Sequence, residues 1–467
     1  MTTTPPTAPR AALESHGQSH VLRFLAELPE AGKARLLGQL ATLDIAHLAG
    51  LAAAYVTTKP PVHIPAKLDP VKVYPRTPAP EHAELYKKAH ARGMELLSGG
   101  KVAAFLVAGG QGTRLGYDGP KGEFPVTPVR SKPLFQVFAE QLLSWAKLTG
   151  KLAPWYIMTS DVNDAATRAF FAANGHFGYP PGDVVFFQQG MIPAFSSDGK
   201  LLLAEKDSLA LAADGHGGSL AALHKSGALA DMRRRGITHL SYFQVDNPLV
   251  HTLDPLFLGL HDLMGSEMSS KTIPKAHALE KVGNFCVGDG VLQVIEYSDL
   301  PESLAKLTNA DGRLRFNAGS IAIHALRLDF IERLTASGNL SLPWHRAEKK
   351  MPFVDATGDT IRPETPNAVK LEQFVFDAIP LAKNAIVLET DRAEEFSPVK
   401  NADGGDSPAT SRRDQSARHA RWLAAAGVAV PSDATVEISP LYAPTQAALI
   451  ARMPTIAVPA GGKVYIE

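Results

Sequence analysis

The chain lacks most of the features that restrict a protein's function at first sight. Its 467 residues include one cysteine, Cys286, which excludes an internal disulfide and a cysteine-rich zinc site. The 47 basic and 47 acidic residues give a formal net charge of +0 and therefore no global attraction to nucleic acid or anionic membranes. No apolar run approaches the roughly 20 residues of a membrane span. We expect a cytoplasmic, soluble protein with no nucleic-acid or membrane partner, in which anion binding is local.

Repeats and an export signal are absent as well. No period of roughly 20 to 50 residues recurs, so repeat architectures are excluded. The first ten residues, MTTTPPTAPR, are rich in Thr and Pro and lack an apolar core, which predicts a disordered tail. With 467 residues of which 45% are hydrophobic, the chain is too long for one ordinary core. We expect two or three units.

One segment stands out from this neutral background. Residues 102–126 read VAAFLVAGGQGTRLGYDGPKGEFPV: a buried-strand pattern, a glycine-rich turn, and then Arg114 and Lys121. Glycines in such a turn allow backbone N–H groups to point at an anion, and a side chain would block its approach. Arg114 adds a forked cation and Lys121 a mobile point charge. The segment predicts a polyphosphate-binding loop.

The glycine spacing decides against two common phosphate-binding loops. A dinucleotide-binding turn requires Gly-x-Gly-x-x-Gly, but after Gly110 and Gly112 the third glycine falls at Gly116, one position late. The Walker pattern requires Ser or Thr after its Lys to hold magnesium, and here Gly122 follows Lys121. A hydride-transferring enzyme and a P-loop ATPase are therefore disfavoured. A tight strand-to-helix turn with no ligand stays an alternative on this segment alone.

The central part of the chain alternates strand-like and helix-like segments. We expect strands at 103–107, 155–159, 184–188 and 239–245, and helices at 134–148, 161–173, 219–234 and 255–264. This βαβ rhythm predicts a parallel sheet with helices on both faces, whose ligands bind beyond the carboxyl ends of the strands. The glycine turn and the sequence VDN at 245–247 both follow such strands.

The flanking regions differ from this centre. Helical spacing from Val21 to about Val56, and again from Glu81 to Leu97, predicts a helical lead-in. Beyond about Ser266, shorter strands and a Gly288-Asp289-Gly290 turn predict an inserted antiparallel platform. We expect an α/β fold in three parts: a tail and helical lead-in (1–98), a central domain with a mixed sheet (99–395) and a small C-terminal domain (396–467).

Several stretches, taken in order, resemble one enzyme family. They are VAGGQGTRLG with PKG, PWYIMTS (154–160), FFQQGMIPAF (186–195), VDN, EYSDL (296–300), RFNAGSIAIH (315–324), KLEQFVFD (370–377) and EFSPVKNADG (395–404). The set, spanning about residues 80 to 410, resembles the UDP-sugar pyrophosphorylases of eukaryotic type, and most closely the UDP-N-acetylhexosamine branch. The resemblance implies a Rossmann-like nucleotidyltransferase core.

The resemblance also implies a reaction and its residues. A sugar 1-phosphate, with N-acetylglucosamine 1-phosphate as first choice, would attack the α-phosphorus of UTP to give a UDP-sugar and pyrophosphate. Such a reaction needs aligned anions and neutralised charge rather than an activated nucleophile. Arg114, Lys121 and Lys400 would be catalytic and Asp246 would face Mg²⁺. The nucleotide would contact the following residues: Ala108, Gly109, Gly110, Gln189, Gly215 and Asp246.

The sugar side carries one departure from the family. By resemblance, Glu296, Asn317, Tyr297, Phe374 and Phe376 would contact the sugar or wall its N-acetyl group. Next to Gly215, however, His216 replaces the asparagine of the N-acetylhexosamine enzymes, as in the Gly-His-Gly of UDP-glucose pyrophosphorylases. A UTP–glucose-1-phosphate or broad-specificity enzyme is therefore the alternative, and a non-catalytic sugar-nucleotide sensor is a second one. We expect His345 and Glu348 to form no structural metal site.

Overall fold

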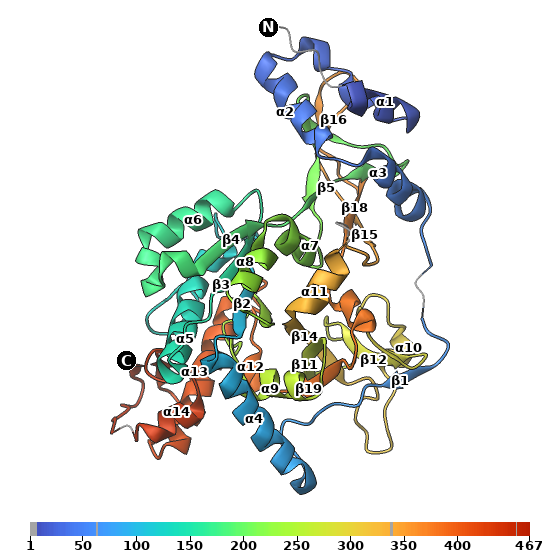
Figure 1. Cartoon of the computed structure of the whole chain (residues 1–467). Helices are drawn as coiled ribbons and strands as arrows, with labels where there is room; N and C mark the ends of the chain where they lie inside the picture. The colour runs from blue at the N-terminus through green and yellow to red at the C-terminus, as the bar shows by residue number, and fades with distance from the viewer. Residues whose placement is uncertain (1–6, 62–63, 337–339, 454) are drawn as a thin grey trace. The chain divides into compact units, whose positions relative to one another are not determined.

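Figure 1 shows the computed structural model, which describes residues 7–61, 64–336, 340–453 and 455–467. The chain forms two compact units. Unit 1 comprises Met1–His63, Gly190–Gly218 and Leu342–Val375, and unit 2 comprises Ile64–Gln189, Ser219–Ser341 and Phe376–Glu467. The three-part division expected from the sequence cuts the chain elsewhere, at residues 98 and 395. Sequence order could not predict these units because unit 1 is assembled from three separated segments.

A mixed sheet is the centre of unit 2. Within the described residues it has ten strands, of which seven follow the order β1-β12-β14-β10-β2-β3-β4, while β11 and β13 pair with β14 and β12, and β19 pairs with β11. Four neighbouring strands are parallel: β10 (His239–Gln244), β2 (Val102–Val107), β3 (Trp155–Thr159) and β4 (Val184–Gln188). They are the four strands predicted from the βαβ rhythm, and the prediction of a mixed-sheet α/β fold is confirmed.

Helices cover both faces of the parallel strands. On one face, Phe138 of α5 (Leu134–Thr149) packs against Phe243 of β10, and Phe171 of α6 (Asp164–Ala173) packs against Trp155 of β3. On the other face, the Tyr156 hydroxyl donates to Asp231 of α8 (Ala228–Arg234) at 2.6 Å. Because both faces are buried, the strands read as continuous apolar runs, which is why the sequence revealed them.

The predicted helices match the observed ones with one exception. The lead-in helix expected at 81–97 is α4 (Ala83–Ser98), and the helix expected at 255–264 is α9 (Pro255–Leu263), where Asp254 caps the first turn. The single helix predicted at 219–234 is wrong. The structure has α7 (Gly218–Lys225) and α8 instead, because Gly227 takes a left-handed conformation with φ +80°.

The antiparallel strands do not form a separate platform, as the sequence suggested, but extend the same sheet. The hairpin predicted around Gly288-Asp289-Gly290 is present, with the buried Cys286 on its first strand, where burial raises the pKa of the thiol to about 12. The strands of this part are β1 (Leu68–Pro70), β11 (Met268–Pro274), β12 (Asn284–Gly288), β13 (Val291–Ile295), β14 (Ala318–Arg327) and β19 (Ile386–Glu389). The short helix α10 (Glu302–Ala305) lies between β13 and β14, while α11 (Leu328–Thr335) follows β14 and α12 (Arg392–Glu395) follows β19.

The C-terminal region packs within unit 2. It contains α13 (Pro408–Ala425), β20 (Thr435–Ile438), α14 (Gln446–Ala451) and β21 (Lys463–Ile466), and the two strands pair in parallel. Ser407 begins α13 with a capping box to Thr410. A small apolar cluster that includes Trp422, Val436 and Leu449 holds these elements together.

Unit 1 has its own core. Leu36 and Leu40 of α2, Ile45 of α3 and Phe195 of β6 belong to one apolar cluster, so the N-terminal helices pack on distant strands. The elements of unit 1 are α1 (Thr7–Ser15), α2 (Glu30–Ala41), α3 (Ile45–Leu51), β5 (Met191–Pro193), β6 (Phe195–Ser196), β7 (Leu203–Glu205), β8 (Ser208–Leu209), β9 (Leu211–Ala213), β15 (His345–Lys349), β16 (Phe353–Val354), β17 (Thr360–Ile361) and β18 (Ala368–Glu372).

The N-terminal part contains a predicted tail and a pair of apolar helices. Of the predicted disordered tail, residues 1–6 lie outside the described residues, whereas residues 7–10 already belong to α1. In the described part of the chain no single helix has both the length and the hydropathy to cross a membrane. The bent pair Glu30–Ala41 and Ile45–Thr57 passes that test by length and composition only.

Candidate active site

The glycine turn leaves β2 at the carboxyl edge of the parallel strands. Asn163, fully buried, holds its backbone: the side-chain amide donates to the carbonyls of Ala108 at 2.9 Å and Gly110 at 3.3 Å. Asn163 itself is fixed because its Oδ1 accepts from Ser160 N at 2.8 Å, just after β3. Both carbonyls therefore point into the protein, which frees the opposite side of the turn for a ligand.

Gln189 follows β4 and lies directly against Gly109. A Cβ atom at Gly109 would be 2.4 Å from Gln189 Oε1, closer than any real side chain permits. A Cβ at Gly110, in contrast, would meet no atom within 4 Å. Gly109 is thus required by the position of Gln189 itself, whereas at Gly110 the protein leaves space open. The two glycines and the amide predicted to recognise uracil are brought together.

Lys121 is held by the packing of its neighbours. The backbone N–H of Lys121 donates to Gly110 O at 3.1 Å, so the lysine segment returns to the glycine turn. A Cβ at Gly122 would lie 2.1 Å from the Phe135 ring, and only glycine lets α5 approach so closely. The Pro-Lys-Gly sequence therefore fixes the backbone from which the ammonium group extends.

Asp246 and Asn247 follow β10 and connect it to the segment of Lys400. Asn247 is buried; its amide donates to Glu395 O at 2.8 Å, and its Oδ1 accepts from Ser397 N at 3.1 Å. Val399 N donates to Asp246 O at 2.8 Å. The structure therefore brings Lys400 to the same strand end as Asp246, although the two residues are 154 positions apart in the sequence.

The charges around this edge interact. Burial is the main influence on Lys121 and lowers its pKa below the ordinary value; Asp246 opposes this effect, while Arg114 and Lys400 add to it. The other three predicted residues thus lie within electrostatic reach of Lys121. Arg114 is exposed, and neither its guanidinium nor the Lys121 ammonium has a hydrogen-bond or ion-pair partner among the described residues. Such a group of available cations suits a polyphosphate.

Asp406 is an unpredicted neighbour of this group. Its carboxylate lies 3.9 Å from Lys400 Nζ, and its carbonyl accepts from Lys400 N at 2.7 Å. Burial is the main cause of the raised pKa of Asp406, which Lys400 opposes and Asp246 reinforces. The sequence gave no reason to single it out, because an acidic residue in the loop NADGGDSP is typical of a solvated turn.

One other group of side chains has the make-up of a metal site. Ligand atoms of His251, Asp254 and Glu395 lie within 4.8 Å of one another, and they form the single such group among the described residues. However, Lys271 Nζ lies 2.6 Å from Asp254 Oδ2 and 2.5 Å from Glu395 Oε1. The ammonium group thus occupies the place of a cation, and the cluster is a buried ion-pair network.

Of the predicted sugar residues of unit 2, Glu296 and Tyr297 directly follow β13 and Asn317 directly precedes β14, whereas Phe376 lies in the short helix Val375–Leu381. Asn317 Oδ1 accepts from Lys275 N at 3.0 Å, and a Cβ at Gly283 would lie 3.0 Å from Glu296 Oε1. Tyr297 is 46% exposed and Phe376 is buried. Asn317 and Glu296 therefore flank the same loop, residues 275–283.

The predicted sugar residues of unit 1, His216 and Phe374, belong to a stack of rings centred on Phe374. The Phe374 ring lies 5.1 Å from that of His216 and 4.3 Å from that of His345. Val375 N donates to His216 Nδ1 at 3.1 Å, so the ring proton of the neutral histidine is on Nε2. Burial, followed by the charge of His345, lowers the pKa of His216 to about 4.

Gly215 allows this arrangement. Its φ is +87°, and a Cβ there would lie 2.3 Å from Gln373 O. Gln373 N in turn donates to Asp214 O at 2.8 Å, and Gly217 N donates to Gln373 O at 2.8 Å. The Asp-Gly-His-Gly-Gly loop is therefore bound backbone to backbone to the strand end that carries Phe374. A role of Gly215 in nucleotide binding stays a prediction.

Sequence reasoning missed the residues that hold this site together. Asn163 sits at the start of a predicted helix, where Asn is a common cap, and Asn247 was noted only as part of VDN. The signal that could have found both is an asparagine directly after a buried strand, since Asn offers a donor and an acceptor to adjacent backbone. No local pattern indicates Lys271.

The comparisons with known proteins agree with this site. A family model described as UTP–glucose-1-phosphate uridylyltransferase matches residues 60–405. The human UDP-N-acetylhexosamine pyrophosphorylase-like protein 1 is 40% identical over 439 residues, which cover 90% of this chain and 85% of that protein. The UDP-N-acetylglucosamine pyrophosphorylase of Saccharomyces cerevisiae is 39% identical over 357 residues, covering 74% of this chain and 75% of that protein.

A solved structure extends the likeness to the fold. The uridine diphosphate N-acetylglucosamine pyrophosphorylase from Trypanosoma brucei, crystallised with an inhibitor, has a TM-score of 0.81 and 26% sequence identity, covering 100% of this chain and 99% of that one. The family model alone matches well over half of the chain. The chain therefore belongs to the UTP–glucose-1-phosphate uridylyltransferase family of nucleotidyltransferases.

Proposed function

We propose that this protein transfers a uridylyl group from UTP to a sugar 1-phosphate, with N-acetylglucosamine 1-phosphate as its preferred acceptor and pyrophosphate as the leaving group. The observation that carries the proposal is the gathering of Arg114, Lys121 and Lys400 at the strand edge that also holds the glycine turn. The names of the relatives support the choice of sugar.

The geometry supports a mechanism of positioning and charge neutralisation. The sugar phosphate is already a nucleophile, so the protein must hold two anions close together and stabilise charge that moves onto the leaving pyrophosphate. Lys121 and Arg114 extend from the same short segment as the turn, and Lys400 follows Val399, whose N–H donates to Asp246 O. Gln189 would pair with the donor and acceptor of the uracil edge, while the turn gives backbone groups to the nucleotide.

Magnesium is part of the proposal. The Asp246 carboxylate is half-buried at a strand end and makes no hydrogen bond or ion pair with any residue in the described ranges. Carboxylate oxygen is the ligand that Mg²⁺ prefers, so Asp246 would hold the ion. When bound, the ion would neutralise phosphate charge. Asp246→Asn should then raise the magnesium concentration that half-maximal turnover requires.

UTP–glucose-1-phosphate transfer is the second candidate, and His216 favours it. Histidine at this position is the pattern of the UDP-glucose enzymes, and the family model carries glucose in its description. The neutral ring offers Nε2–H as a donor, whereas the family asparagine would offer an amide.

A coupled assay decides between these readings. Pyrophosphate release would be measured with UTP and a panel of sugar 1-phosphates at equal concentration, with CTP and ATP as alternative nucleotides. We expect UTP and N-acetylglucosamine 1-phosphate to give the highest kcat/KM. If glucose 1-phosphate is the best substrate, the second candidate function is correct. If no pair of nucleotide and sugar 1-phosphate releases pyrophosphate, only the hypothesis of a non-catalytic sugar-nucleotide sensor is left.

The compartment is proposed from chemistry alone. The single thiol is buried and protonated, and no disulfide is possible with one cysteine. UTP is an intracellular substrate, and a reducing cytoplasm suits this composition.

A further inference from the structure

The helix α13 presents an unusual buried face. Ser411, Gln415 and Arg418 are spaced four and three residues apart, so they lie on one side of the helix. They are 0%, 3% and 7% exposed. A buried helix face is normally apolar, and here it carries hydrogen-bond donors. From its sequence this stripe is typical of a solvated surface.

Each of the three side chains donates to the backbone of a different segment. Gln415 Nε2 donates to Val126 O at 3.0 Å, Arg418 Nη1 to Leu249 O at 3.0 Å, and the Ser411 hydroxyl to Ser397 O at 2.9 Å. Val126 follows Lys121 by five positions, Leu249 follows Asp246 by three, and Ser397 precedes Lys400 by three. One helix face thus contacts all three segments that carry the central charges of the proposed site.

Neighbouring residues of α13 strengthen two of these links. Arg412 donates to Pro125 O at 2.7 Å, beside the contact of Gln415. Asp414 accepts from the Ser397 hydroxyl at 2.8 Å, beside the contact of Ser411. The segments after Lys121 and before Lys400 are therefore each bound to the helix by two hydrogen bonds.

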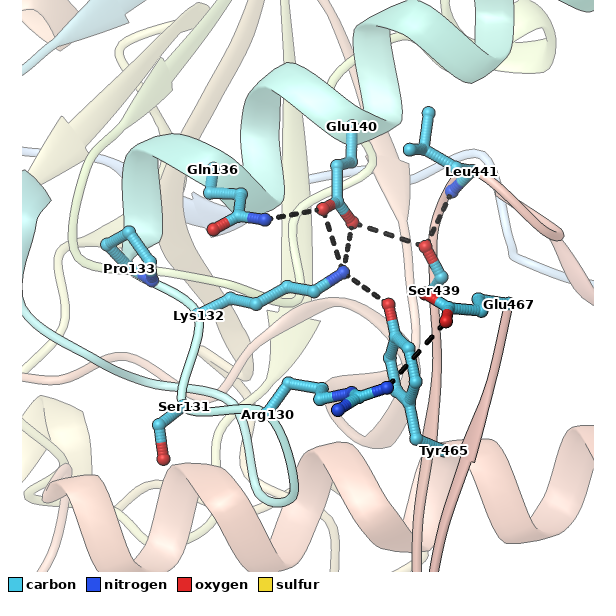
Figure 2. Close-up of a pocket in the computed structure, with 10 residues that line it drawn as sticks. All are labelled: Arg130, Ser131, Lys132, Pro133, Gln136, Glu140, Ser439, Leu441, Tyr465 and Glu467. Atoms are coloured by element: carbon cyan, nitrogen blue, oxygen red, sulfur yellow. Dashed lines mark hydrogen bonds and ion pairs between the residues drawn. The ribbon is translucent and has the colours of Figure 1, made fainter. Parts of the chain in front are cut away.

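A cavity of about 380 Å³ lies beside the later part of the loop after Lys121, beyond the buried Val126. Figure 2 shows this cavity, lined by residues 130–133 of the loop and by the C-terminal strand. Lys132 points from the loop to Glu140 at 2.7 Å and to the Tyr465 hydroxyl at 2.6 Å.

We infer that the buried polar stripe Ser411-Gln415-Arg418 positions Lys121, Asp246 and Lys400 for uridylyl transfer. Ser411, Gln415 and Arg418 are positioning residues, since their side chains contact backbone and not substrate. The inference rests on the proposed function, because it assigns the stripe to the charges that this function requires. It gives the C-terminal region a part in the reaction that neither the glycine turn nor the lysine motifs indicate.

Gln415→Met is the sharpest test, because methionine has a similar length and no donor. We expect kcat to fall by about 10- to 100-fold, the order that a small misplacement of a catalytic group produces, while the KM for UTP changes little. Arg413→Met is the matched control: it removes a polar side chain from the exposed side of the same helix, where Arg413 is 71% exposed and bonds only to Asp414 among the described residues. Its kcat should equal that of the wild type.

A double-mutant cycle separates positioning from mere destabilisation. If Gln415 acts through Lys121, adding Gln415→Met to Lys121→Met should lower kcat no further, because the group that it positions is already lost. A general loss of folded protein would lower kcat by the same factor in both backgrounds, and this additive result would overturn the inference. Thermal unfolding of each variant would establish the folded fraction.

The outcomes distinguish the two proposals. If the wild type releases no pyrophosphate, or Lys121→Met retains full turnover, the proposed function or the role of Lys121 fails. If Lys121→Met loses turnover but Gln415→Met does not, the inference fails and the proposed function stands.

Discussion

At the scale of single residues, Lys121 combines a positive charge with partial burial. Burial first, and then the charges of Arg114 and Lys400, lower the pKa of Lys121, with Asp246 opposing them. Only its protonated form can neutralise phosphate oxygens. We therefore predict that kcat/KM for UTP falls with rising pH earlier than an ordinary lysine, which titrates at about 10.4, would allow. A pH profile of kcat/KM measures this, since that ratio reports groups of the free enzyme.

Two variants of Lys121 provide the controls for this profile. Arginine remains charged throughout the range, so Lys121→Arg should lose the alkaline decline even if its maximum is lower. Lys121→Met should lower turnover on the order of 10²-fold, because one preorganised electrostatic contact is removed. If kcat/KM of Lys121→Arg still declines at alkaline pH as in the wild type, the decline arises from another titrating group.

We expect the choice of sugar to depend on His216. With a pKa of about 4 it is neutral at pH 6 to 9, so we predict a constant sugar preference over that range and a change only on approaching pH 4. The folded pKa lies below that of an unfolded histidine, so the unfolded chain binds more protons between the two values. Stability associated with His216 is thus present at neutral pH and is lost as pH falls from about 6.5 toward 4.

Two substitutions test the same residue. Asparagine can accept from Val375 N through Oδ1, as His216 Nδ1 does at 3.1 Å, so His216→Asn should fold normally and widen the preference for N-acetylglucosamine 1-phosphate over glucose 1-phosphate. His216→Leu cannot accept and should cost about 1–3 kcal/mol of stability. The ratio of kcat/KM for the two sugars would be compared; a ratio unaffected by His216→Asn contradicts a role in selectivity.

At the scale of elements, α4 and α9 pack backbone to backbone. A Cβ at Gly93 of α4 would lie 1.8 Å from Pro255 O, and one at Gly259 of α9 would lie 1.7 Å from Ala89 O. We predict that Gly93→Ala destabilises the protein by about 1–3 kcal/mol or more, since the helices must separate, although alanine favours helix formation. Gly38→Ala, on α2 with nothing within 4 Å of its Cβ, is the control and should stabilise slightly. Urea unfolding would measure both, and equal effects would contradict the packing argument.

The elements also show how far the sequence could lead. The parallel strands, the glycine turn and the helices α5, α6 and α9 were predictable, because buried strands are continuously apolar and the helices between them carry apolar residues at helical spacing. Arg114, Lys121 and Asp246 were predictable because they lie in segments that follow β2 and β10, whereas Lys400 came only from the resemblance of EFSPVKNADG to the family. The contacts of Asn163, Asn247 and the α13 stripe were not, since a buried polar side chain bonded to a distant carbonyl looks like any exposed polar residue in the sequence.

At the scale of the whole molecule, distant segments are joined by polar contacts that no local pattern contains. The 190–218 and 342–375 segments join the N-terminal helices in unit 1, which a contiguous division of the chain could not give. Within unit 2, Lys271 of β11 meets Asp254 at the start of α9 and Glu395 at the end of α12. The Glu395 carbonyl also accepts a hydrogen bond from the Asn247 amide, so this network supports the segment that leads to Lys400.

The Lys271 network yields a prediction for global stability. Removing a buried ammonium leaves buried negative charge without compensation, so Lys271→Met should destabilise the protein by about 3–5 kcal/mol at pH 7. Burial alone would raise the pKa of Asp254, but the nearby Lys271 lowers it. In the wild type the contribution of Asp254 is therefore present above its unfolded pKa, about 3.9, and is lost only as pH falls through the folded value.

The variant should show the opposite pH dependence. Without Lys271 the buried carboxylates gain from protonation, so the folded state binds more protons than the unfolded one and the stability of Lys271→Met rises as pH falls from 7 to 5. The difference from the wild type should narrow over that range in urea unfolding. Lys306→Met, which breaks the exposed pair with Glu302, is the control and should leave the free energy of unfolding nearly unchanged at every pH, because water screens an exposed ion pair. A difference for Lys271→Met that stays constant with pH would show that lost packing, not uncompensated charge, causes the destabilisation.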